Sequence, residues 1–148
     1  MILPFVIGLG SHHGDDRAGW LVLDRLRERH YPQTHLIRLQ HPADLLDVID
    51  VEKSLVICDA CVGAGIPGSI HLFRWPSDKL CYEKASGSHD LSLCSVMELG
   101  RQLGGLPEAA EIWTLEGTVW SAGTEPSDLV RSSAIQLADR IWDSHGDA

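Results

Sequence analysis

Short apolar runs alternate along the chain with segments in which apolar residues recur at helical spacing. Residues 54–61 form the most strand-like run, continuous and rich in β-branched residues, as buried parallel strands are. Residues 2–9, 34–39 and 110–117 are interpreted as further strands, and residues 68–75 alternate as an edge or antiparallel strand does. The pattern therefore predicts five strands.

Four helices are predicted between and after these strands. Asp15 or Asp16 would cap the first helix, and Ser127 or Asp128 would cap the last. The predicted helices cover residues 15–30, 43–51, 90–103 and 127–142. The order β-α-β-α-β-β-α-β-α predicts a three-layer α/β/α sandwich with a mostly parallel five-stranded sheet and one antiparallel edge strand. A length of 148 residues indicates one domain, residues 1–148.

The composition is that of an ordinary globular protein, with 44% hydrophobic and 22% charged residues. A net charge of −9 argues against a nucleic-acid or anionic-membrane partner, because no basic patch is available to neutralise phosphates. No apolar run reaches the length of a membrane span, and no signal peptide is evident. Four cysteines in such a chain favour reduced thiols, so we expect a cytoplasmic location.

Polar residues gather where the predicted strands end. In an open α/β sheet, functional residues lie beyond the carboxyl ends of the strands, so these side chains should share one rim. The residues concerned are Asp15, Asp16, Gln40, His41, Asp59 and His89. Asp59 ends an apolar strand, where a carboxylate is costly to bury without a partner. Carboxylates and an imidazole on one rim form a reasonable ligand set for a divalent metal.

Each of these residues also has a purely structural interpretation. The aspartate pair 15–16 can cap a helix and favour its dipole, and Asp59 can serve as a turn residue. His89 can belong to a helix N-cap together with Ser88 or Asp90. The metal-site hypothesis therefore depends on their convergence on one rim.

The glycines of residues 8–14 follow a strand, as they do in a dinucleotide-binding turn. A pyrophosphate needs bare backbone N–H groups at a helix N-terminus, where the aspartate pair 15–16 would repel it. The acidic residue expected to bind the ribose is replaced by Leu39-Gln40. Nucleotide binding is therefore the less favoured alternative.

Cys58 and Cys61 form a CxxC pair at the end of a predicted strand. A redox CxxC usually starts a helix, where the thiol pKa falls, and a zinc site would need a second well-spaced pair. We therefore interpret both cysteines as small buried residues.

Four segments, in order, resemble the hydrogenase maturation endopeptidases. They are VIGLGSHHGDDRAGW, LVICDACVGAGIPGSI, SGSHDLSLCSVMEL and LEGTVWSAGTEPSDLV, and together they span nearly the whole chain. The resemblance implies an endopeptidase, grouped with aspartic-type peptidases, that removes a C-terminal extension from the large-subunit precursor of a nickel–iron hydrogenase after nickel insertion.

The resemblance also implies roles for individual residues. The nickel arrives with the substrate and is recognised by Asp16, Asp59 and His89, so no permanently bound cofactor is expected. Asp16 and Asp59 are the implied catalytic residues. Independently of the resemblance, the position of His41 two residues past the second predicted strand makes it a candidate fourth ligand. We expect a monomer with the precursor as its partner.

The chain departs from the family pattern in three places. Arg17 replaces the glycine that commonly follows the acidic pair, the preceding loop reads SHHG, and LQHP follows the second strand. These changes leave open the alternative that the chain is a divergent paralogue that acts on another metalloprotein. A non-catalytic metal-dependent docking or chaperone module on the same fold also remains an alternative.

Overall fold

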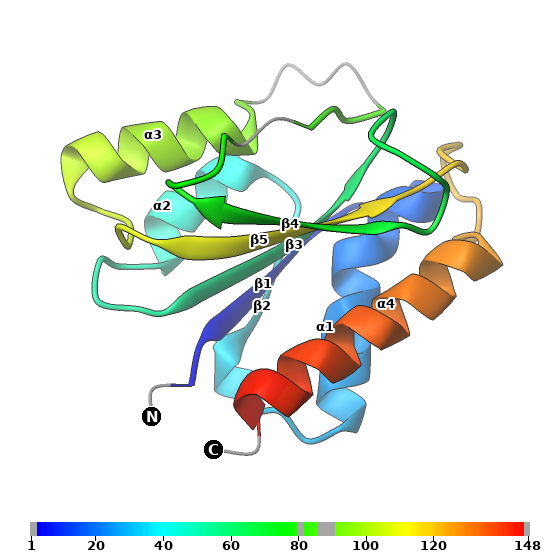
Figure 1. Cartoon of the computed structure of the whole chain (residues 1–148), viewed down its shortest axis with the longest axis horizontal. Coiled ribbons are helices and arrows are strands. Elements are labelled where there is room, and N and C mark those ends of the chain that lie inside the picture. The colour runs from blue at the N-terminus through cyan, green and yellow to red at the C-terminus, as the bar shows by residue number, and fades with distance from the viewer. Residues whose placement is uncertain (1–2, 80–81, 86–90, 147–148) are drawn as a thin grey trace.

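A five-stranded sheet forms the centre of the molecule (Figure 1). The computed structural model describes residues 3–79, 82–85 and 91–146. The strands lie in the order β2-β1-β3-β5-β4. Their bounds are β1 Phe5–Leu9, β2 Leu36–Leu39, β3 Leu55–Cys61, β4 Ile70–Trp75 and β5 Ala110–Glu116.

Four of the strands are parallel, and the edge strand β4 is antiparallel to its neighbour β5. In the centre of the sheet, Ile7 of β1 pairs with Ile37 of β2 and Ile57 of β3. At the edge, Leu72 pairs with Trp113. This topology confirms the predicted mostly parallel sheet with one antiparallel edge.

Helices cover both faces of the sheet, which confirms the three-layer α/β/α architecture (Figure 1). The helices are α1 Ala18–Glu28, α2 Leu45–Val48, α3 Leu93–Leu103 and α4 Asp128–Ile141. Helices α1 and α4 pack on one face, and α2 and α3 lie on the other. No helix in the described part of the chain has the length and hydropathy needed to span a membrane.

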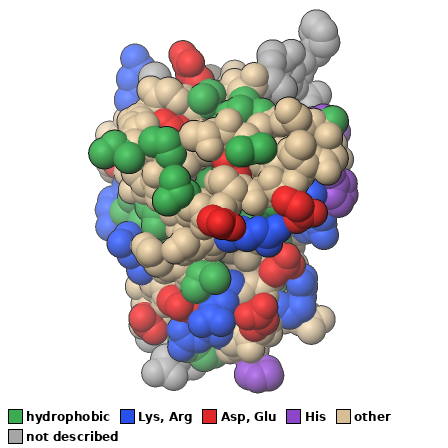
Figure 2. Space-filling model, turned by 90° about the vertical axis from the view of Figure 1, so that its right-hand side faces the viewer, with side chains coloured by type: hydrophobic (Ala, Val, Ile, Leu, Met, Phe, Trp, Pro, Cys, Tyr) green, Lys and Arg blue, Asp and Glu red, His purple; other side chains and the backbone are tan. Residues whose placement is uncertain are grey.

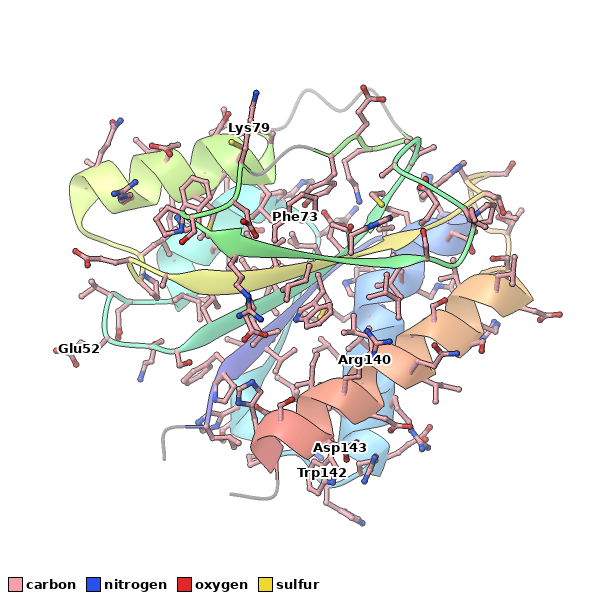
Figure 3. The ribbon with its side chains drawn as sticks, in the orientation of Figure 1. Glu52, Phe73, Lys79, Arg140, Trp142 and Asp143 are labelled. Carbon is pink, nitrogen blue, oxygen red and sulfur yellow. The ribbon has the colours of Figure 1, made fainter. Side chains whose placement is uncertain are left out.

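The two cores follow from the alternation of side chains along each strand. Val6 and Val56 pack toward α1 and α4, whereas the adjacent Ile7 and Ile57 pack toward α2 and α3. All four side chains are buried. Figure 3 shows side chains such as Glu52 and Lys79 directed outward from this framework. Strands that are apolar at successive positions are thus explained by burial on both faces.

Helix α4 begins after Ser127, whose hydroxyl caps it as predicted, whereas the other three helices differ from the predictions in their start or length. Residues 14–17 form a 3₁₀ turn, and α1 begins only at Ala18 without a side-chain cap, so the predicted capping by Asp15 or Asp16 is wrong. The predicted helix 43–51 is reduced to one α-helical turn at Leu45–Val48. Helix α3 begins after Ser92, whose hydroxyl accepts a hydrogen bond from the backbone N–H of Ser95.

Candidate functional site

Three segments that are distant in the sequence meet at the carboxyl edge of the sheet. Asp16 lies in the turn after β1, Asp59 lies near the end of β3, and residues 82–84 follow β4. We call residues Tyr82–Lys84 the strap. An isolated bridge joins Val62 to Glu83, in which the N–H of Val62 donates to the carbonyl of Glu83 at 3.0 Å. The strap is thereby fixed beside the end of β3.

Lys84 lies between the two aspartates that the sequence singled out. Its Nζ is 2.8 Å from Asp16 Oδ1 and 2.6 Å from Asp59 Oδ1. The same Nζ donates to the carbonyl oxygen of Ala60 at 3.0 Å. A lysine ammonium has three N–H donors, so these contacts provide one acceptor for each. The two carboxylates therefore share a single cation.

The remaining carboxylate oxygens are also hydrogen-bonded. Tyr82 donates its hydroxyl to Asp59 Oδ2 at 2.8 Å, and Asp59 Oδ1 accepts a second hydrogen bond, from the N–H of Ala60, at 2.8 Å. On the other side, Ser11 donates its hydroxyl to Asp16 Oδ2 at 2.6 Å. Because each carboxylate is held at both oxygens, Asp16 Oδ1 and Asp59 Oδ1 are oriented toward the same point.

Burial and the attraction between opposite charges shift the pKa values of Asp59 and Lys84 in opposite directions. Burial raises the pKa of Asp59, and the charge and hydrogen bond of Lys84 with the hydrogen bond of Tyr82 offset only part of that shift. For Lys84, burial lowers the pKa, but the attraction of Asp59 and Asp16 outweighs it and the pKa is raised. Burial and the nearby Asp59 raise the pKa of Tyr82. Lys84 is therefore a cation and Tyr82 a neutral donor near neutral pH.

Asp15 has a different role from its neighbour. It is completely buried, and its carboxylate accepts hydrogen bonds from the N–H groups of Thr118, Val119 and Ser127 at 2.8, 3.0 and 2.6 Å. The hydroxyl of Ser127 donates to it as well, at 3.0 Å. Asp15 thus joins the loop after β1 to the loop after β5.

Glu116 is a buried acid that the sequence interpretation missed. It ends β5, is 2% exposed, and accepts the N–H groups of Ala64 and Gly65 at 2.7 and 2.8 Å. The sequence does indicate Glu116, because an acidic residue at the end of an apolar strand is the same signal that identified Asp59. Lys84 was missed as well, and it carries no comparable signal since it lies in a segment without periodicity. Glu116 holds the loop after β3 in place.

The structure describes only two of the three residues in the predicted ligand set. It joins Asp16 and Asp59 through Lys84, but His89 lies outside the described residues. His41 is exposed and lies two residues after β2. Among the residues that the structure describes, no group of three or more histidine, cysteine, aspartate or glutamate side chains is arranged to hold a metal ion.

The two cysteines of the CxxC pair are buried within β3. Burial raises the pKa of Cys58, and burial also raises the pKa of Cys61 to about 11. The Sγ of Cys61 is 3.7 Å from Glu116 Oε2. A thiol in this state is a poor nucleophile at neutral pH, which agrees with the structural interpretation of both residues.

The glycines of the first loop serve packing within the protein. A Cβ on Gly8 would overlap the carbonyl oxygen of Gly19 in α1, and a Cβ on Gly14 would overlap the carbonyl oxygen of Val119. Gly14 also has a φ of 56°, a left-handed conformation that favours glycine. The resemblance to a dinucleotide-binding turn is therefore explained by close contacts between backbone segments.

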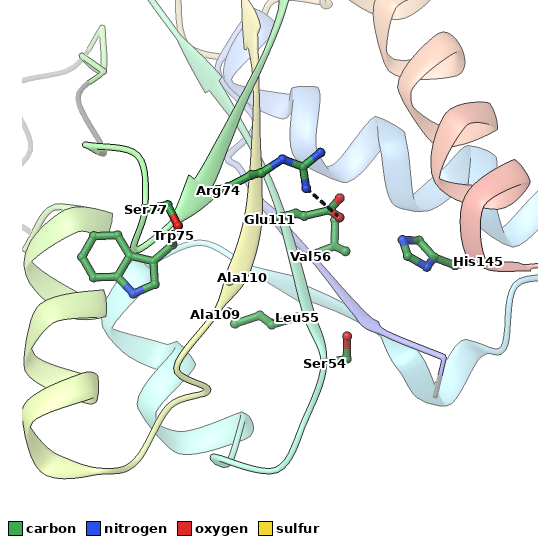
Figure 4. Close-up of a pocket in the computed structure, with 10 residues that line it drawn as sticks. All are labelled: Ser54, Leu55, Val56, Arg74, Trp75, Ser77, Ala109, Ala110, Glu111 and His145. Carbon is green, nitrogen blue, oxygen red and sulfur yellow. Dashed lines mark ion pairs between the residues drawn. The ribbon is translucent and has the colours of Figure 1, made fainter. Parts of the chain in front are cut away.

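A pocket of about 330 Å³ lies at the opposite edge of the sheet, near the amino ends of β3 and β5 (Figure 4). Its polar lining includes His145 and the ion pair between Arg74 Nη1 and Glu111 Oε2, at 3.9 Å. Ligands of open α/β sheets bind beyond the carboxyl ends of the strands, so the Asp16–Asp59 rim is the stronger candidate.

In Figure 2, acidic and basic side chains alternate across the lower half of the face in view.

No protein-family model matches the sequence, and no curated protein matches it. Solved structures do share its fold. The hydrogenase maturating endopeptidase HybD from Escherichia coli aligns with a TM-score of 0.74 and 18% identity, over 97% of this chain and 91% of that chain.

Two further structures show the same likeness. The [NiFe] hydrogenase maturation protease HycI from Thermococcus kodakarensis KOD1 aligns with a TM-score of 0.67 and 22% identity, over 93% of this chain and 88% of that chain. The endopeptidase HycI from Escherichia coli aligns with a TM-score of 0.70 and 16% identity, over 98% and 94%. The chain thus has the fold of the hydrogenase maturation endopeptidases, which confirms the resemblance seen in the sequence at the level of fold.

Proposed function

We propose that this protein is an endopeptidase that removes a C-terminal extension from the large-subunit precursor of a nickel–iron hydrogenase after nickel has been inserted. The observation that carries the proposal is the convergence of Asp16 and Asp59 on one cation at the carboxyl edge of the sheet. The fold and the four sequence segments in matching order support the same activity.

The substrate's nickel would replace the cation that the two carboxylates share. Asp16 Oδ1 and Asp59 Oδ1 both approach one nitrogen atom, so they are oriented to bind one ion. His89 is the proposed third ligand, on the basis of its sequence motif. Carboxylates and imidazole together suit a borderline divalent metal. Recognition would then require that the precursor already carries its metal.

Cleavage requires activation of a water molecule or polarisation of the scissile carbonyl. The metal carried by the substrate can polarise the carbonyl, and a carboxylate of Asp16 or Asp59 can accept the proton of the attacking water. Both carboxylates are fixed by neighbouring donors, which limits their reorientation during the reaction. We therefore assign the catalytic role to this pair, in a cytoplasmic enzyme that acts as a monomer.

The proposal is tested by incubating the protein with nickel-loaded and nickel-free forms of a large-subunit precursor and following the cleaved peptide by mass spectrometry. The wild type should cleave only the loaded form. Asp16→Asn and Asp59→Asn should each reduce the rate at least ~100-fold, because the changes remove a charged ligand but keep the side-chain volume. The exposed Asp143 provides a control, since Asp143→Asn removes the same charge far from the rim.

Unchanged cleavage by both rim variants would contradict the proposal. A wild-type protein that binds the loaded precursor without cutting it would instead favour the metal-dependent docking module. His89→Ala should abolish cleavage as well, and a fully active His89→Ala variant would remove this histidine from the ligand set.

A further inference from the structure

We propose that Lys84 is a displaceable counter-ion that occupies the cation position of the Asp16–Asp59 pair until a divalent metal borne by the substrate replaces it. Lys84 would thereby determine specificity, because a precursor without metal offers no cation for the exchange. The inference rests on the proposed function for its substrate, but the competition itself is a property of this chain.

The ammonium and a metal ion cannot occupy the site together. The Nζ of Lys84 lies 2.8 Å from Asp16 Oδ1 and 2.6 Å from Asp59 Oδ1. A divalent metal bound to the same two oxygens would lie about 2.0–2.2 Å from each, within the space that Nζ occupies. Lys84 must therefore leave before a metal can bind both carboxylates.

Charge favours the exchange in one direction only. A single ammonium leaves one of the two carboxylate charges uncompensated, whereas a divalent ion neutralises both. A monovalent cation offers no such gain and would also lose the third contact that Lys84 makes, with the carbonyl of Ala60 at 3.0 Å. The site should thus reject monovalent cations and admit divalent ones.

Lys84 can move without dismantling the strap. Its side chain is 34% exposed, and the flexible four-carbon stem allows the ammonium to turn into solvent. The strap keeps two other attachments, namely the hydrogen bond from the Tyr82 hydroxyl to Asp59 Oδ2 and the bridge between Val62 and Glu83. When the cation leaves, Asp59 therefore keeps its hydrogen bond from Tyr82, and Asp16 keeps the one from the Ser11 hydroxyl.

The test is calorimetric titration of Ni²⁺ into the free protein, which needs no precursor. Lys84→Met removes the ammonium but keeps the length of the side chain, and it should bind Ni²⁺ at least ~10-fold more tightly than the wild type, because the competing charge is gone. Lys84→Arg, which keeps a cation, should bind as weakly as the wild type. Lys79→Met is the matched control, since Lys79 is exposed and points away from the body of the molecule (Figure 3), and its affinity should not change.

Location and folding are checked in the same experiment. Adding Asp59→Asn to Lys84→Met should abolish the gain, which places the metal at the rim. Circular dichroism verifies that each variant is folded. A folded Lys84→Met protein that binds Ni²⁺ no more tightly than the wild type would overturn the proposal.

A second measurement uses the wild type, in case Lys84→Met does not fold. With ¹³C-labelled lysine, the Cε resonance of Lys84 should shift toward that of exposed Lys79 as Zn²⁺, a diamagnetic probe, is added. An unchanged resonance at millimolar Zn²⁺ would refute displacement. If Lys84→Met gains affinity but no form of the protein cleaves a loaded precursor, the proposed function fails and the counter-ion role stands. If the wild type cleaves a loaded precursor but Lys84→Met binds Ni²⁺ no more tightly, the proposed function stands and the counter-ion role fails.

Discussion

Asp15 and Asp16 are adjacent in the chain, yet their carboxylates bind different parts of the fold. Asp15 is completely buried and holds the backbone of Thr118, Val119 and Ser127, whereas Asp16 binds Ser11 and the ammonium of Lys84 at the rim. Asp15 thus has a structural role, whereas the carboxylate of Asp16 lies at the rim beside Asp59. Substitutions at the two positions should therefore have different consequences.

Asp15→Ala should lower the free energy of unfolding by about 3 kcal/mol, because three part-buried backbone N–H groups and the Ser127 hydroxyl lose their acceptor, at about 1 kcal/mol or less each. Asp16→Ala should cost no more than about 1 kcal/mol, since its side chain is partly exposed and its ion pair is screened. Urea denaturation of both variants measures the difference. Equal losses would show that the two carboxylates are both structural.

Cys58 and Cys61 should resist alkylation in the folded protein. With a pKa of about 11 for Cys61, only about one thiol in 10,000 is ionised at pH 7, and burial also limits access. Iodoacetamide labelling followed by mass spectrometry checks this, with half-buried Cys94 as the internal comparison. Rapid labelling of Cys58 or Cys61 without urea would contradict the structural interpretation.

Replacing both cysteines tests their role directly. The double variant Cys58→Ser, Cys61→Ser should retain precursor processing and lose about 1–3 kcal/mol of stability per buried hydroxyl without a partner. Loss of processing in a folded double variant would assign these thiols a function.

Gly8→Ala should be strongly destabilising, by about 2–4 kcal/mol, because its Cβ would meet the backbone carbonyl of Gly19 and force α1 away from β1. Gly105→Ala is the matched control, since nothing lies within 4 Å of a Cβ added there. Thermal unfolding compares the two. A stable Gly8→Ala protein would mean that the helix can shift without loss of packing.

Asp139 should contribute stability that depends on pH. Hydrogen bonds from Arg25 and Arg29 lower the pKa of Asp139 in the folded state, so its contribution is present above the unfolded pKa of about 3.9 and is lost as pH falls through the lower folded value. Asp139→Asn should therefore cost about 0.5–1 kcal/mol at pH 7, a modest value because the pair is partly exposed, and less near pH 2. Urea titrations at both pH values measure this, with Asp143→Asn as control.

The sheet was predictable because strands buried on both faces leave a clear mark in the sequence. Residues 54–61 are apolar at nearly every position, and β3 occupies residues 55–61. The predicted helix 43–51 failed because only Leu45 and Ile49 are buried there, which is too little to stabilise more than one α-helical turn. Amphipathic spacing alone does not reveal how much of a segment reaches the core.

The sequence predicted the two aspartates of the rim but not Lys84. Asp16 follows β1 and Asp59 lies near the end of β3, so the carboxyl-edge rule of parallel sheets located both of them. Lys84 lies in a strap whose place depends on Tyr82 and Glu83 contacting β3 and the residue after it, and such tertiary contacts leave no periodic signal. The same rule could have located Glu116, which ends β5.

The attachment of Asp15 to the loop after β5 has a consequence for the order in which parts of the protein fold. Its hydrogen-bond partners lie 103 to 112 residues further along the chain. During synthesis the loop after β1 therefore emerges long before the groups that fix it, and contacts of such long range form late in folding. The turn that carries Asp15 and Asp16 therefore gains its full set of hydrogen bonds only after Ser127 has been synthesised, late in translation.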